Sequence, residues 1–216
     1  MRRLARPIGL LSVAGGLVLA ATLTLAPSAS AASTVPVTFD CQARPPIGSP
    51  QQLTLSTSIQ ADAPETVAAG GTFEATLAPD PMTVPTTAGG YSVNNLRGLL
   101  LKVPVPQGAT VDAATLTGGS NLGTDTPTVS QADGVVTVTV PGPLAGGATF
   151  QLPALHLTLT ATGAAGTTID TRLAGTGYDD PGLTFTANVK VGFFPVNVPT
   201  SCFANPSPTF TSTTIS

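Results

Sequence analysis

A single histidine, His156, is the residue of this sequence best suited to proton transfer, so any Ser-His or Cys-His mechanism must use it. Leu155 and Leu157 flank it in the segment ALHLTLT, and this alternation places His156 on the outward face of a strand. No recognised motif sets a nucleophile or an orienting carboxylate beside it. The sequences G-x-S-x-G, H-E-x-x-H, C-x-x-C and Walker-type loops are absent. The pattern therefore favours a solvent-exposed strand histidine over a catalytic one.

Adjacent carboxylates occur at Asp179 and Asp180, and Asp170 lies a short way upstream. Oxygen ligands of this kind bind Ca²⁺ at the loop ends of some extracellular β-sandwiches. The alternative is ordinary turn chemistry, because Asp followed by Pro181 and Gly182 favours a turn without any ion. We therefore expect no metal and no cofactor, with Asp179 and Asp180 as the candidate ligands if a metal does bind.

The two cysteines, Cys41 and Cys202, lie near opposite ends of the chain. An even, widely spaced pair in an exported protein predicts a disulfide. Free thiols or metal ligands are the alternative, but a third ligand at suitable spacing is missing. We expect one disulfide that joins the N- and C-terminal segments.

Residues 1–31 predict a cleaved export signal. They combine a basic start, an apolar stretch and a small-x-small motif: Arg2, Arg3 and Arg6, then residues 8–25, then Ala29-Ser30-Ala31. A membrane anchor is the alternative reading of the apolar stretch. The break at Pro27 and the small residues after it favour cleavage, and we expect no transmembrane segment in the mature chain.

The charge balance excludes some partners. Without Arg2, Arg3 and Arg6, five basic residues remain against eleven acidic ones, a net charge of −6. Such a balance argues against nucleic acid and against an anionic membrane surface.

Aromatic platforms for carbohydrate are also scarce, because Trp is absent and Tyr numbers only 2. In the pair Phe193-Phe194, alternation predicts one ring inward and one outward, and one exposed ring is common on folded surfaces.

The strand pattern is clearest between Asp133 and Thr160. Val136, Val138 and Val140 share one parity, a Gly/Pro-rich loop follows, and the next apolar series changes phase once around Pro153, where we expect a bulge or bend. Similar alternation recurs along the chain without a convincing helical period. We predict an all-β, antiparallel β-sandwich of about nine or ten strands. Residues 32–216 would form a single domain with a short polar C-terminal tail.

Three motifs resemble those of the immunoglobulin-like modules that recur in bacterial surface proteins. They are turn-and-core motifs: Val67, Gly70 and Phe73; Val105, Pro106, Gly108 and Ala113; and Leu144, Gly147 and Leu152. The resemblance implies an Ig-like sandwich and carries no chemistry. The whole chain also resembles small secreted proteins of high-GC Gram-positive bacteria, some of which carry a cyclase or dehydratase label.

These observations favour a secreted, non-enzymatic structural or binding module of the cell envelope, whose partner is an envelope protein or polymer. The alternative is a carrier that holds a small apolar ligand between its sheets, because the composition is aliphatic and only 9% charged. A cyclase- or dehydratase-like enzyme is the third hypothesis, and it would depend on His156 and Asp179.

Overall fold

The computed structural model describes residues 32–216, and the predicted export signal lies outside the described residues. Residues 32–216 form 17 strands and no helix, five of the strands being only two residues long. The described residues contain no helix that is long and apolar enough to cross a membrane. The strands are β1 (Ser33–Ala43), β2 (Gln51–Asp62), β3 (Thr66–Val67), β4 (Thr72–Pro79), β5 (Met82–Thr83), β6 (Thr87–Ala88), β7 (Tyr91–Pro104), β8 (Ala109–Thr117), β9 (Thr128–Ala132), β10 (Val135–Val140), β11 (Leu144–Ala145), β12 (Thr149–Phe150), β13 (Ala154–Ala161), β14 (Thr168–Thr171), β15 (Leu183–Val191), β16 (Phe194–Ala204) and β17 (Thr211–Ile215).

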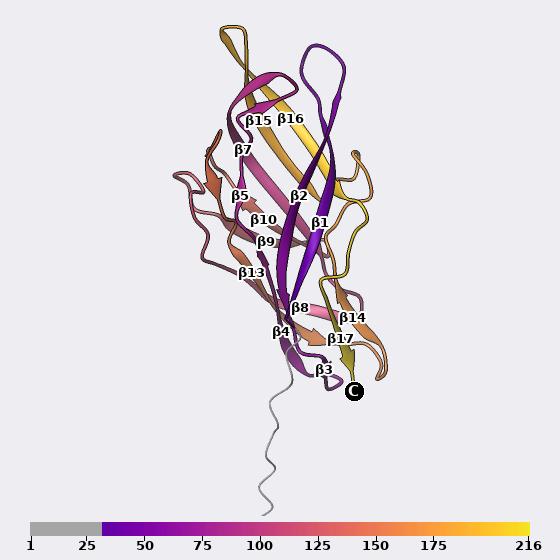
Figure 1. The fold of residues 1–216 in the computed structure, drawn as a ribbon. Coiled ribbons are helices and arrows are strands. Elements are labelled where there is room, and N and C mark those ends of the chain that lie inside the picture. The colour runs from indigo at the N-terminus through magenta and orange to yellow at the C-terminus, as the bar shows by residue number, and fades with distance from the viewer. Residues whose placement is uncertain (1–31) are drawn as a thin grey trace, which may run out of the picture.

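Most of the strands belong to one continuous antiparallel sheet. Its main path has the order β8-β13-β4-β2-β1-β16-β15-β7-β10-β9, and β6 and β11 add to β7. The first and last strands of this path, β8 and β9, lie beside each other, and Gln131 Nε2 of β9 donates to the Val111 carbonyl of β8 at 3.4 Å. The sheet is therefore folded over into two facing layers, which confirms the all-β antiparallel prediction (Figure 1).

The core lies between these layers and follows the predicted alternation. In β13, Leu155, Leu157 and Leu159 are buried, and the residues between them are partly exposed. Burying such side chains supplies most of the favourable free energy of folding. The predicted phase change at Pro153 is confirmed as a break, because β12 before it pairs with β5 and β13 after it pairs with β4 and β8.

The C-terminal segment corrects one prediction. Instead of a polar tail, residues 211–215 form β17, which pairs antiparallel with β14 and parallel with β3. Ile215 and Thr213 are fully buried, and the Thr213 hydroxyl donates to the Pro64 carbonyl at 2.8 Å. A threonine whose hydroxyl is hydrogen-bonded can be buried at little cost, so a polar-looking sequence forms part of the core.

The elongated molecule has two different ends (Figure 1). One holds β3, β17 and the C-terminus. The other holds the β1–β2 loop and the β15–β16 turn, and the register places the β6–β7 turn on the same side, because Ser92 pairs with Lys190 one residue before Val191. Segments far apart in sequence, near residues 47, 91 and 193, therefore lie at the end opposite to the C-terminus.

Candidate functional site

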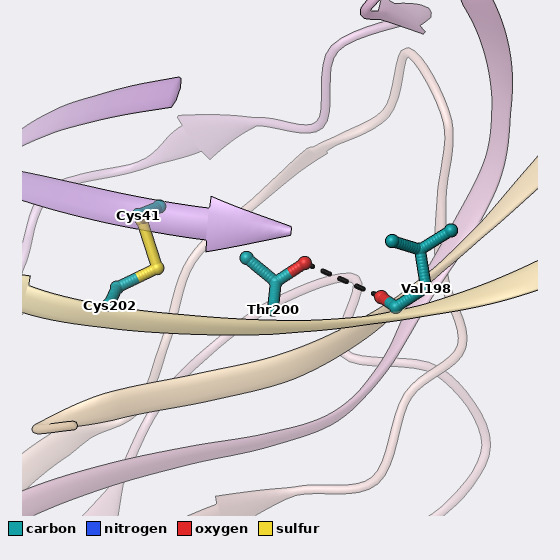
Figure 2. The surroundings of a disulfide bond; sticks show 4 residues. All are labelled: Cys41, Val198, Thr200 and Cys202. Atoms are coloured by element: carbon teal, nitrogen blue, oxygen red, sulfur yellow. Dashed lines mark hydrogen bonds between the residues drawn. A yellow bond between two sulfur atoms is a disulfide. The ribbon is translucent and has the colours of Figure 1, made fainter. Parts of the chain in front are cut away.

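The predicted disulfide is present between Cys41 and Cys202. These residues are direct partners in the register of β1 and β16, with Cα atoms 4.1 Å apart (Figure 2). Both are fully buried, and the neighbouring Thr200 donates to the Val198 carbonyl at 3.4 Å within the same strand. The described residues include no free cysteine, because both cysteines are in this disulfide.

His156 has partners that the sequence did not reveal. Its Nδ1 lies 2.8 Å from Glu74 Oε1 and 3.1 Å from Thr76 Oγ1, both on β4. Its Nε2 lies 2.7 Å from Thr117 Oγ1 on β8. The imidazole therefore joins three neighbouring strands on the outer face of the sheet, and the outward orientation that was predicted is confirmed. Glu74 was missed because it lies 82 residues away in sequence and becomes a neighbour only through the pairing of β4 with β13.

The order carboxylate, imidazole, hydroxyl is the one that activates a hydroxyl nucleophile in hydrolases. Here Nδ1–H can donate to Glu74 while the Thr117 hydroxyl donates to Nε2. The surroundings differ from those of such enzymes, because the side chains of His156 and Glu74 are 26% and 60% exposed. An open groove of about 300 Å³ nearby is lined by Thr76 but not by His156 or Thr117. The contacts link three strands across the outer face of the sheet.

The candidate calcium ligands make separate contacts. Asp179 Oδ1 lies 3.2 Å from Arg44 Nη2, and the Thr176 hydroxyl donates to Asp180 Oδ2 at 3.0 Å. Asp170 instead contacts Arg172 at 3.4 Å. Within residues 32–216, no group of three His, Cys, Asp or Glu side chains is placed to hold a metal ion. In this structure Asp179 takes part in an ion pair, and Asp180 accepts a hydrogen bond within its turn.

The most unusual surface feature is a set of exposed apolar side chains at one end, which we call the apolar end. The large hydrophobic residues exposed in the described part of the chain are Ile47 (91%), Tyr91 (48%), Val191 (40%), Phe193 (92%) and Phe194 (74%). All five lie on or beside the three connections at the end opposite to the C-terminus.

Both phenylalanines of the predicted inward–outward pair are exposed, so that prediction was wrong for one ring. Phe193 lies in the turn that joins β15 to β16, where Gly192 adopts a φ of 62°, and Phe194 pairs with Val191 at the base of the turn. The first two residues of β16 are exposed, and burial becomes regular only from Val198. The hairpin thus projects beyond the packed core, and neither face of its tip is covered.

The interior between the layers is closely filled. A cavity of about 20 Å³ lies between the layers, lined by apolar side chains that include Ile59 and Leu77 on one side and Leu101 and Val138 on the other. This volume is about that of one water molecule, whereas drug-sized ligands need roughly 300 Å³ or more. The cavity is too small for the apolar ligand that a carrier would hold.

The fold and the disulfide define an all-β, disulfide-linked protein. No family model matches the chain, and no curated protein matches it. Among solved structures, it is similar to a protein of Corynebacterium diphtheriae described as membrane-anchored, with a TM-score of 0.57 and 20% sequence identity. The alignment covers 85% of this chain and 38% of that protein, so this chain spans well under half of its length. At this identity the likeness concerns the fold.

Proposed function

We propose that this protein is a secreted, non-enzymatic module of the bacterial cell envelope that binds an envelope component through its apolar end. The observation that carries the proposal is that Ile47, Tyr91, Val191, Phe193 and Phe194 all gather at one end of the molecule. Single exposed hydrophobic residues are common on soluble proteins, but several at one end of a molecule are typical of an interaction surface.

The energetics support a covered state of this end. Burying a phenylalanine side chain is worth about 1.5–3 kcal/mol relative to leaving it in water. In the isolated chain Phe193 and Phe194 lack most of this burial free energy, because they are 92% and 74% exposed. A partner that covers both rings would recover it.

The sequence and the disulfide together support this location. The predicted export signal would take the chain out of the cytosol, and disulfides persist mainly in such oxidising compartments. The similar fold of a corynebacterial protein described as membrane-anchored fits an envelope location. The Ig-like character implied by the turn-and-core motifs belongs to the same proposal, since modules of that kind recur in bacterial surface proteins.

One contact favours a second candidate function. The Glu74–His156–Thr117 series has the order needed for an acid–base mechanism, so the enzyme hypothesis has a definite test. Unchanged turnover in a His156→Ala variant would assign these residues to the sheet. Loss of a measurable turnover in the same variant would instead support an enzyme.

Cell fractionation tests the main proposal. The protein should be recovered with the envelope of the bacterium that produces it and should cross-link there to a partner. Recovery in the clarified medium alone, without a cross-linked partner, would contradict it.

A further inference from the structure

We propose that the apolar end docks on a lipid surface that carries anionic headgroups. This inference rests on the proposed function, because it takes the apolar end to be the binding surface and identifies what it binds. Three properties of this end carry it: its shape, its local charge and the kind of side chains at its tip.

The shape favours lipid over a protein partner. The exposed side chains project from three separate connections, the β1–β2 loop, the β6–β7 turn and the β15–β16 turn. A stable protein interface needs a continuous patch of about 20–30 residues on each side. Separate projecting tips offer no such patch, whereas the headgroup region of a bilayer deforms around any side chain that enters it.

The local charge is opposite to that of the whole chain. The apolar end is built from residues 44–51, 88–93 and 188–197, which contain Arg44 and Lys190. All eleven Asp and Glu residues lie outside these segments. Arg44 contacts Asp179 at 3.2 Å, while no ion pair is found for the exposed Lys190 in the described part of the chain. Asp179 offsets the charge of Arg44, so the local charge that can face an anionic headgroup is that of Lys190, and the net charge of −6 does not describe this end.

The side chains at the tip are suited to the boundary between water and hydrocarbon. Phe193 is the most exposed of the five, and Lys190 lies three residues before it on the same hairpin. If the rings enter the bilayer, the long side chain of Lys190 can remain at the level of the headgroups. Tyr91, with an apolar ring and a polar hydroxyl, is typical of the same region.

Vesicle co-sedimentation tests the proposal with defined lipids. The purified protein is mixed with vesicles of phosphatidylcholine alone and with vesicles of phosphatidylcholine and phosphatidylglycerol in equal amounts. We expect stronger binding to the second kind, weakened by added salt. Phe193→Ser/Phe194→Ser should lower the partition coefficient about a hundredfold or more, and Lys190→Glu should lower it for anionic vesicles only. Ile47→Ser should weaken binding independently of the β15–β16 hairpin.

His156→Ala is the matched control, because His156 lies on β13, which carries none of the five exposed residues of the apolar end, and the variant should leave vesicle binding unchanged. All the tip variants change exposed side chains, so their unfolding transitions should coincide with that of the native chain. If a variant of the β15–β16 hairpin has a lowered unfolding transition, Ile47→Ser tests the apolar end in its place.

The same variants separate the two proposals. Equal binding to both vesicle types, or binding that survives Phe193→Ser/Phe194→Ser, would overturn the lipid assignment. So would a concentration-dependent dimer that the double variant abolishes, since the occupant would then be a second copy. If vesicles do not bind but retention by isolated envelopes still requires Phe193 and Phe194, the lipid assignment fails and the proposed function stands. If neither vesicles nor envelopes respond to the double variant, the proposed function fails.

Discussion

Cys41 and Cys202 are direct cross-strand partners, so the disulfide joins residues 161 apart in sequence through neighbouring positions on β1 and β16. In the chain-entropy account, closing a loop of this size in the unfolded chain stabilises the folded state by about 5 kcal/mol. We expect Cys41→Ala/Cys202→Ala to lower the free energy of unfolding by up to that amount in denaturant titrations. Titration of the native chain under reducing conditions should give the same loss, and an unchanged free energy in both would contradict the role.

The burial of β17 predicts a loss of stability on substitution that a polar tail would not show. Ile215 is fully buried, while Thr214 on the same strand is exposed. Replacing a buried isoleucine by alanine costs about 2–5 kcal/mol, because apolar contact is lost and a cavity remains. We expect Ile215→Ala to lower the thermal unfolding midpoint clearly and Thr214→Ala to leave it nearly unchanged. Equal midpoints for both variants would place the segment outside the core.

Gly182 is held where no side chain fits. A Cβ atom there would overlap the Ala174 carbonyl oxygen, while Gly182 N donates to the Cys202 carbonyl at 3.0 Å and fixes its position. Overpacking of this kind costs about 1–3 kcal/mol. We expect Gly182→Ala to destabilise the protein by that amount in urea titrations. Gly177→Ala is the matched control in the same loop, because nothing lies near its added Cβ. A neutral Gly182→Ala would show that the loop can move.

The contact between His156 and Glu74 should be worth little to stability. Both side chains reach solvent, and surface ion pairs contribute about 0–1 kcal/mol. A double-mutant cycle of His156→Ala and Glu74→Gln measures this coupling directly. We expect a coupling energy below about 1 kcal/mol. A value of several kcal/mol would mean that the three-strand link is a main element of the fold.

The sequence predicted what depends on local pattern. Alternation in Leu155, Leu157 and Leu159 identified the core side of β13 and the outward side that carries His156, and the spacing of the cysteines predicted the disulfide. The structure forms 17 strands rather than the nine or ten expected, and ten of them make up the main path of the sheet. The five two-residue strands were not foreseen, because so short a segment shows no period.

The features that were missed depend on contacts between distant segments. Glu74 becomes a partner of His156 only when β4 and β13 pair. The sequence of β17 is polar, and its burial depends on hydrogen bonds of its threonine hydroxyls to distant segments. The exposure of both Phe193 and Phe194 has a similar cause. Alternation predicts one buried face only where a second layer covers the strand, and the β15–β16 hairpin extends past that layer.

The central claim is that the apolar end holds the protein at the cell envelope, and retention of tip variants in living cells tests it most directly. The producing bacterium would express the native chain, Phe193→Ser/Phe194→Ser or His156→Ala, and the fraction of each in envelope and medium would be measured. Removing both exposed rings from the contact should cost about 3 kcal/mol or more of binding free energy. We expect the double variant in the medium and the other two proteins in the envelope fraction. Equal retention of all three would contradict the account.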